Sequence, residues 1–136
     1  MRYFAKIIDG VVNQIIVAEP EFFLTFNDTT PGYWVETDKN TLGGIHYDPD
    51  TGQPSLDQTK ALRKNYAQIG GYYNQELDMF IPRKLYASWT LNTTTGLWDP
   101  PIPEPSRENL AFNQFYHWNE EQQQWILHTY DFMVQS

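Results

Sequence analysis

The first eighteen residues show a hydrophobic pattern that predicts two strands joined by a tight turn. The segments "YFAKII" and "VVNQIIVA" flank Asp9-Gly10, and an Asp-Gly dipeptide readily adopts the positive φ angles of a two-residue hairpin turn. We therefore predict a β-hairpin over residues 3–18. Further along, "EPEFFLTF" (19–26) predicts one helical turn with its phenylalanines on one side, and "GYWVET" (32–37) predicts a short strand.

A loop and then a helix are predicted next. Residues 38–54 are rich in Gly, Pro, Asp and Asn, which is typical of turns and loops. Ser55 and Gln58 have the spacing of a capping box, in which two side chains satisfy the free backbone N–H groups at a helix start. Apolar side chains then recur at helical spacing until Gly70-Gly71. We predict a helix over residues 55–67.

The C-terminal half contains one sequence pattern three times. An asparagine that follows a large apolar residue precedes an aromatic ring by six positions: Asn74 and Phe80, Asn92 and Trp98, Asn119 and Trp125. Asparagine starts a turn by bonding its own backbone, and the return strand brings a second large side chain beside the first. The pattern predicts three degenerate hairpins, although short motifs of this kind also recur by coincidence.

Together these elements predict a mainly β (α+β) fold, in which consecutive hairpins build a small antiparallel sheet with one or two short helices. The segment "PPIPEPSREN" (100–109) predicts an extended proline-rich connector. It would separate a main body, residues 1–99, from a C-terminal hairpin arm, residues 110–136. The length of 136 residues suits one domain with such an attached end.

Composition narrows the classes of partner. The net charge of −8 argues against nucleic acid, because binding phosphates needs a basic surface, and against docking on anionic lipid. The absence of cysteine excludes a disulfide scaffold, a thiolate nucleophile and cysteine-ligated zinc, and fits folding in a reducing cytoplasm. The N-terminus does not resemble a signal peptide, and no segment approaches the ~20 apolar residues of a membrane span.

One segment has the beginning of a calcium-loop motif. "HYDPDTG" (46–52) contains Asp-x-Asp-x-Gly, in which alternate carboxylates could converge on one ion. Gly52 stands where the loop needs an oxygen ligand, and Thr59 stands where it needs glutamate. A turn with proline at its second position explains the same residues, and we predict that turn. The three histidines lack zinc spacing, and no catalytic motif occurs, so we expect no catalytic, cofactor-binding or metal-binding residues.

The aromatic residues are the strongest candidates for an interaction site. They make up 16% of the chain, and large rings are common in cores and in protein interfaces. The candidates for core or interface are Trp89, Trp98, Tyr116, Trp118 and Trp125. The alternative is stacking on sugar rings, as exposed aromatic side chains do in carbohydrate-binding modules.

Several segments in a fixed order carry a resemblance to a known family. They are "FAKIIDGVVNQIIVA", "GGIHYDPDTGQP", "ALRKNYAQIGGYYNQELDMFIP", "SWTLNTTTGLWDPPIP" and "YHWNEEQQQW". As an ordered set, they resemble a family of small proteins encoded by tailed bacteriophages of marine and freshwater bacteria, cyanophages prominent among them. The resemblance covers nearly the whole chain and departs at "RKLYASW", where members usually have a proline-richer link. It implies a viral context, often among structural genes, and no catalytic residue.

We therefore expect a non-enzymatic virion structural protein that folds in the host cytoplasm and joins the particle in multiple copies. Capsid decoration is the first expectation, with aromatic contacts to the major capsid protein on the outer shell. The first alternative is a tail, baseplate or fibre-associated component, bound to a tail or fibre protein. The second is a module that binds host glycans. We expect no cofactor and neither nucleic acid nor membrane as a partner.

Overall fold

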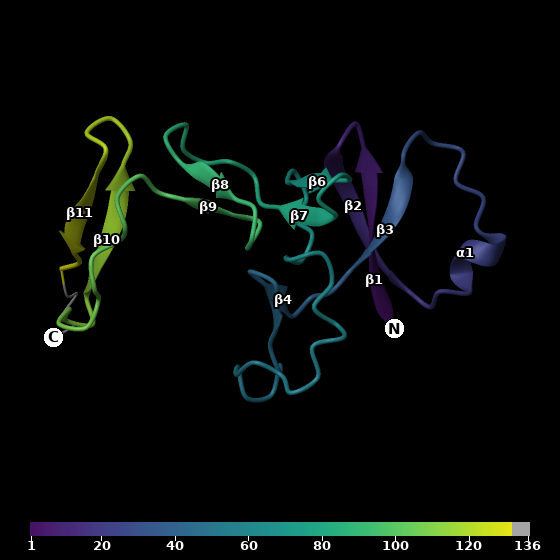
Figure 1. Cartoon of the computed structure of the whole chain (residues 1–136), viewed down its shortest axis with the longest axis horizontal. Helices are drawn as coiled ribbons and strands as arrows, with labels where there is room; N and C mark the ends of the chain where they lie inside the picture. Colours follow the sequence, from purple (N-terminus) through teal and green to yellow (C-terminus); the bar gives the residue numbers. More distant parts are fainter. Residues whose placement is uncertain (132–136) are drawn as a thin grey trace, which may run out of the picture. The chain divides into compact units, whose positions relative to one another are not determined.

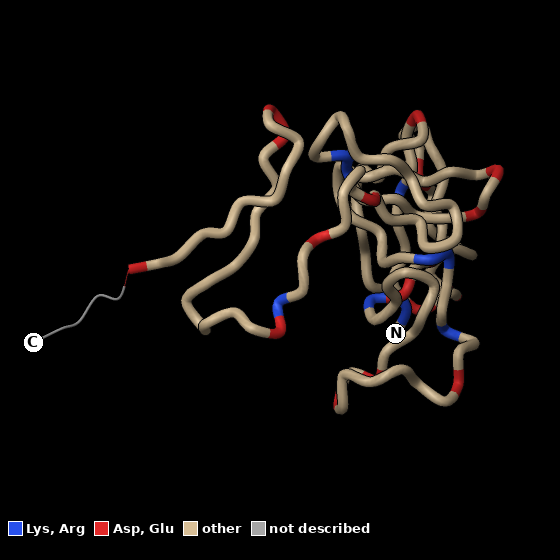
Figure 2. The backbone as a smooth tube through the Cα atoms, turned by 60° about the vertical axis from the view of Figure 1, so that its left-hand side comes forward, with Lys and Arg blue, Asp and Glu red and all other residues tan. Residues whose placement is uncertain are grey.

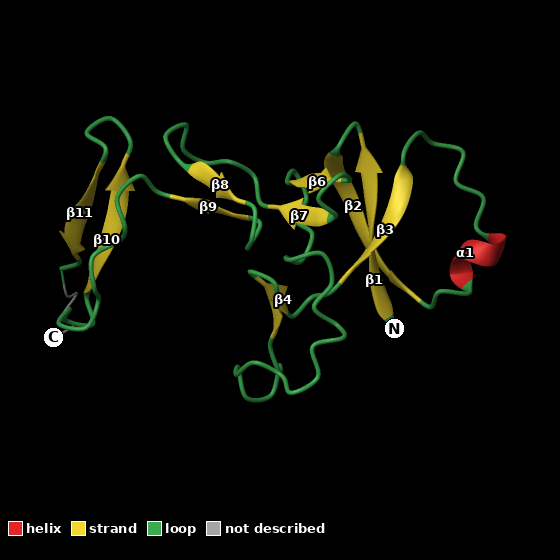
Figure 3. Ribbon diagram, in the orientation of Figure 1, coloured by secondary structure: helices red, strands yellow, loops and turns green. Residues whose placement is uncertain are grey.

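The computed structural model describes residues 1–131 and is mainly β, which confirms the predicted fold class (Figures 1 and 3). The elements are β1 (Arg2–Ile8), β2 (Val11–Ala18), α1 (Phe22–Thr25), β3 (Tyr33–Thr37), β4 (Thr41–Leu42), β5 (Ile45–His46), β6 (Tyr72–Asn74), β7 (Met79–Ile81), β8 (Thr90–Asn92), β9 (Leu97–Asp99), β10 (Gln114–Asn119) and β11 (Gln124–Thr129). None of the described helical segments is long and apolar enough to span a bilayer.

The chain divides into two compact units. The first unit contains Met1–Lys84 and Leu91–Trp98, and the second contains Leu85–Thr90 and Asp99–Ser136. The chain therefore passes from one unit to the other three times. The proline-rich segment 100–109 belongs to the second unit and is not a free connector, because Trp125 Nε1 donates to the carbonyl oxygen of Ile102 at 2.7 Å. Extended proline-rich backbone leaves its carbonyl groups available for such bonds.

The first unit is built on a five-stranded antiparallel sheet in the order β3-β1-β2-β6-β7. The predicted N-terminal hairpin is confirmed as β1–β2. Asp9 and Gly10 both have positive φ, at 51° and 77°, as the predicted two-residue turn requires. The predicted strand over 32–37 is confirmed as β3. Gly32 allows the preceding loop to pass close to β1, because a Cβ atom there would lie 2.3 Å from the carbonyl oxygen of Ile7.

A small hydrophobic core lies against this sheet. It consists of buried side chains from β1, β2, β7 and one loop: Ala5, Ile7, Val12, Ala67 and Phe80. The predicted helical turn is confirmed as α1. Its phenylalanines pack against neighbouring aromatic rings. The rings of Phe22 and Phe26 stack 4.7 Å apart, and the ring of Phe23 lies 4.6 Å from that of Phe4.

The three predicted hairpins are present as β6–β7, β8–β9 and β10–β11, and their turns share one construction. The side-chain oxygen of each asparagine accepts the backbone N–H of the third residue after it: Asn74 from Leu77 at 3.0 Å, Asn92 from Thr95 at 3.2 Å, and Asn119 from Gln122 at 2.8 Å. The fourth residue after each asparagine has a positive φ: Asp78 at 50°, Gly96 at 71° and Gln123 at 51°. The sequence pattern is therefore a repeated turn geometry.

The first and third hairpins carry the expected cross-strand ring pairs. Tyr73 lies opposite Phe80 with ring centroids 5.0 Å apart, and Trp118 lies opposite Trp125 at 5.3 Å. The hairpins differ in their surroundings. β6 extends the five-stranded sheet by pairing with β2, whereas β10 and β11, within residues 1–131, pair only with each other.

The helix predicted over residues 55–67 is wrong, because this segment is irregular. Both residues of the expected capping box bond to β5 instead. The N–H of Ser55 donates to the carbonyl oxygen of His46 at 2.9 Å, and the Gln58 side chain bonds both the N–H and the carbonyl of His46, at 2.8 and 2.9 Å. Residues 63–64 then have positive φ, which no α-helix accommodates.

The segment 38–54, expected to be a loop, contains a small hairpin. β4 and β5 pair across Gly43 and Gly44, which have φ angles of 61° and 87°. The predicted turn follows it: the carboxylate of Asp48 accepts the N–H of Asp50 at 2.8 Å.

Candidate functional site

Three of the five aromatic candidates pack together in the second unit. The ring centroids of Trp118 and Trp125 are 5.3 Å apart, and Trp89 lies 6.1 Å from each of them. Tyr86 adds a fourth ring at 5.2 Å from Trp89. Trp118 is buried. Because Trp118 and Trp125 are directly opposite in the hairpin, they define its inner face, which segment 85–90 contacts.

Glu120 fastens that segment to the hairpin. Its carboxylate accepts the backbone N–H of Ser88 at 2.9 Å, the Ser88 hydroxyl at 2.6 Å and the indole N–H of Trp118 at 2.8 Å. Charged acceptors make the stronger hydrogen bonds. The indole nitrogen of Trp89 is buried and has no hydrogen-bond partner in the described part of the chain. Sequence reasoning missed Glu120, because a glutamate in a predicted turn is expected to face solvent.

The other two aromatic candidates lie elsewhere. Trp98 belongs to the first unit, where its indole N–H donates to the carbonyl oxygen of Pro82 at 2.7 Å. The ammonium of Lys84 lies 5.1 Å from the centre of its ring, a cation–π arrangement. Tyr116 is half-buried on β10, directly opposite Leu127. It therefore shares the hairpin's inner face with Trp118 and Trp125, since side chains two apart on a strand point to the same side.

The opposite side of this hairpin, which we call the outer face, carries Phe115, His117, Ile126 and His128 from the strands and Tyr130 just after β11. The Phe115 ring lies 5.1 Å from that of His128 and stacks on Tyr130 at 5.2 Å. The two histidine rings are 6.1 Å apart. Both histidines are exposed, and Tyr130 is 58% exposed. This face presents a connected cluster of rings to solvent.

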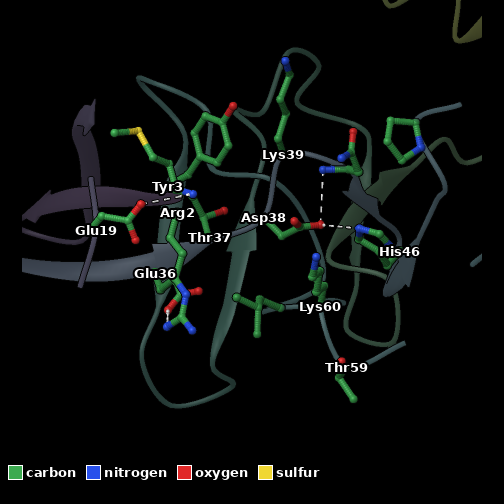
Figure 4. Close-up of a pocket in the computed structure, with 14 residues that line it drawn as sticks. Arg2, Tyr3, Glu19, Glu36, Thr37, Asp38, Lys39, His46, Thr59 and Lys60 are labelled. Carbon is green, nitrogen blue, oxygen red and sulfur yellow. Dashed lines mark hydrogen bonds and ion pairs between the residues drawn. The ribbon is translucent and has the colours of Figure 1, made fainter. Parts of the chain in front are cut away.

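A pocket of about 850 Å³ lies in the first unit (Figure 4). Its lining includes charged side chains of both signs: Arg2, Lys39, Lys60, Glu19, Glu36 and Asp38. In Figure 4 the Asp38 and His46 side chains point toward one another, with 3.4 Å between Oδ2 and Nε2. Since three basic and three acidic side chains line it, the pocket does not favour a ligand of one charge.

Beside this pocket, a hydroxyl, an imidazole and a carboxylate form a chain. Ser55 Oγ lies 2.8 Å from His46 Nδ1, and His46 Nε2 lies 3.4 Å from Asp38 Oδ2. The order is that of a nucleophilic triad, but 3.4 Å is long for a hydrogen bond, and Asp38 Oδ2 already accepts the Thr41 hydroxyl at 2.6 Å. These contacts instead hold β5 to the loop segments that contain Asp38 and Ser55. No residue spacing in the sequence indicates these contacts.

Lys6 is a second missed residue, buried on β1. Its ammonium bonds the carboxylate of Asp28 and the hydroxyl of Thr30 and lies 5.5 Å from the ring centre of Trp34. The hydrogen bond from Lys6, followed by those from Thr30, holds the pKa of Asp28 well below its usual range. This cluster ties the loop before β3 to the sheet.

No group of three or more His, Cys, Asp or Glu residues gathers within residues 1–131 where it could hold a metal ion. Comparison of the chain with protein-family models, curated proteins and solved structures finds no match. The outer face of the C-terminal hairpin is therefore the candidate site with the clearest physical character. Its histidines and Tyr130 are exposed, and it lies on a hairpin whose other face is packed at Trp118 and Trp125.

Proposed function

We propose that this protein is a bacteriophage virion structural protein that decorates the outer capsid shell. It acts by adhesion, in many copies, and no covalent bond is made or broken on it. The family resemblance supplies the viral context. The observation that supports adhesion is the outer face of the β10–β11 hairpin, where half-buried Phe115 and exposed His117, His128 and Tyr130 form one connected ring cluster.

The physical basis is that exposed aromatic clusters are uncommon on surfaces with no partner, and that rings dominate the binding energy of interfaces. A two-stranded hairpin is marginally stable by itself. In the second unit, the tryptophans of the inner face supply the packing that keeps it folded, which leaves the outer face available for a partner. A standard interface buries ~1,600 Å², and repeated copies on a shell let modest contacts act together.

The proposal is tested by counting this protein in washed, mature particles by quantitative mass spectrometry against the major capsid protein. Decoration predicts a stoichiometry on the order of hundreds of copies per particle, as repetition over a shell implies. Absence from particles, despite abundance in infected cells, overturns the virion role. A count from a few to a few tens of copies per particle, which is the range that the rotational symmetry of a tail allows, supports the tail, baseplate or fibre alternative.

A second experiment separates adhesion to protein from adhesion to glycan. Tyr130→Ala and His128→Ala remove exposed rings of the outer face, and tryptophan fluorescence reports whether the inner face stays packed. We expect both variants to fold and to be depleted from particles. If the variants join particles normally, and if the unmodified protein binds host polysaccharide saturably while the variants do not, the partner of this face is a glycan and not the capsid protein.

A further inference from the structure

We infer that the outer face of the β10–β11 hairpin binds a basic, arginine-containing segment of its partner in an extended conformation. This inference rests on the proposed function and names the partner chemistry of the same surface. It depends on three features of the second unit: its charge, the position of that charge on the hairpin, and the rings between.

The second unit is strongly acidic. It contains six acidic residues and one basic residue: Asp99, Glu104, Glu108, Glu120, Glu121 and Asp131 against Arg107. Arg107 is occupied within the unit, since its guanidinium donates to Glu104 at 2.8 Å. An acidic surface attracts a basic partner and repels a copy of itself. The charge therefore disfavours self-association through this face.

The carboxylates stand at both ends of the ring cluster. Glu121 is exposed in the turn between β10 and β11, and Asp131 is exposed directly after Tyr130 at the open end. Figure 2 shows acidic positions at the turn of this hairpin and at its other end, beside the grey trace. Six residues of β10 separate the two ends, and antiparallel strands rise ~3.4 Å per residue. The strand between the two charges is therefore about 20 Å long, and the charges lie just beyond its two ends.

The rings between these charges suit arginine. A guanidinium plane stacks on aromatic faces and also pairs with a carboxylate, whereas an ammonium group is a compact, strongly hydrated charge. Phe115 and Tyr130 stack on one another and lie beside His128. An extended segment with arginines about six residues apart and apolar side chains between them matches both ends and the middle of this face.

The test uses the full chain and the peptide Arg-Thr-Val-Thr-Val-Thr-Arg, whose arginines and valines lie on one side of an extended strand, with lysine-for-arginine and glutamate-for-arginine versions. Binding is measured by NMR titration at low ionic strength. We expect shifts confined to residues 114–131, tighter binding of the arginine peptide than of the lysine peptide, and none of the glutamate peptide. Combined Glu121→Gln and Asp131→Asn should weaken binding about fivefold, the sum of two exposed ion pairs. Tyr130→Ala should weaken it by a similar factor.

Glu76 offers a matched control. It occupies the turn of the β6–β7 hairpin two residues after Asn74, as Glu121 does after Asn119, so Glu76→Gln should leave binding unchanged. The inference is overturned if Glu76→Gln weakens binding as much as the Glu121 and Asp131 changes, if Tyr130→Ala has no effect, or if dilution shows that a second copy covers this face. If the protein binds the arginine peptide but is missing from virions, only the proposed function is rejected. If the protein is present in virions at the expected copy number but does not bind the arginine peptide, only this inference is rejected.

Discussion

Replacing Asn65 with aspartate should destabilise the first unit severely, although the two side chains have almost the same shape. Asn65 is buried with 2% of its surface exposed. Its side-chain nitrogen donates to the carbonyl oxygens of Phe80 at 3.0 Å and Thr95 at 2.9 Å, and its oxygen accepts the N–H of Gly43 at 2.8 Å. One side chain thus joins the β4–β5 turn, β7 and the β8–β9 turn.

The magnitude follows from the lost donors. Aspartate keeps the acceptor for Gly43 but places an oxygen against two carbonyl oxygens. Each buried polar group left unsatisfied costs about 1–3 kcal/mol, so the expected loss is about 3–5 kcal/mol. Typical domains have only 5–15 kcal/mol of unfolding free energy in total. The surroundings leave no space for rearrangement, because a Cβ atom on Gly96 would lie 2.6 Å from the Asn65 side-chain nitrogen.

Urea denaturation followed by far-ultraviolet circular dichroism measures the effect. With slopes of about 1–3 kcal/mol per molar urea for small proteins, the midpoint should fall by more than about 1 M. Asn74→Asp is the matched control, because the Asn74 side chain accepts the N–H of Leu77, a role that a carboxylate retains. A loss below about 1 kcal/mol in Asn65→Asp, or an equal loss in both variants, would refute the assignment of Asn65 as a buried hydrogen-bond hub.

Three further changes test other parts of the molecule. Glu120→Ala removes the acceptor that joins Ser88 and Trp118. It should lower the free energy of unfolding by about 2–3 kcal/mol and shift tryptophan emission to the red. An unchanged emission spectrum and urea midpoint would contradict this. Asp28 has a pKa held below its usual range, first by Lys6, so it contributes stability above about pH 4 that is lost as the pH falls. Asp28→Asn should therefore have a lower free energy of unfolding at pH 7, and this free energy should fall less as the pH is lowered. Urea denaturation at several pH values measures both effects, and identical pH profiles for the two proteins would count against the ion pair. Gly32→Ala, at φ 110° and with no room for Cβ, should lower the thermal midpoint by several degrees, corresponding to about 1–3 kcal/mol.

Local sequence patterns predicted the hairpins because their turn chemistry is local. Asp9-Gly10 and the three asparagine turns each depend on residues within four positions of one another. The helix prediction failed for the opposite reason. Ser55 and Gln58 have the correct local spacing, but His46, nine and twelve residues earlier, provides the hydrogen bonds that they use.

The buried polar residues could not be predicted, because their partners are distant in sequence. Lys6 bonds Asp28 across 22 residues, and Asn65 bonds Thr95 across 30. The candidate site was partly predictable. The aromatic richness of the C-terminal hairpin is visible in the sequence, whereas the division into a packed tryptophan face and an exposed ring face depends on the register Trp118↔Trp125. That register is set by the turn after Asn119.

The second unit is assembled from two separate stretches of the chain, which limits how it can be transferred to another protein. A fragment that begins at Asp99 lacks Trp89, the ring that lies 6.1 Å from both Trp118 and Trp125. Transferring only the continuous segment from Asp99 onward to another protein would therefore give an incompletely packed hairpin. A portable version has to carry residues 85–90 as well, with the β8–β9 segment replaced by a short linker. In the same way, recombination between related genes can exchange this arm intact only when both crossover points lie outside residues 85–131.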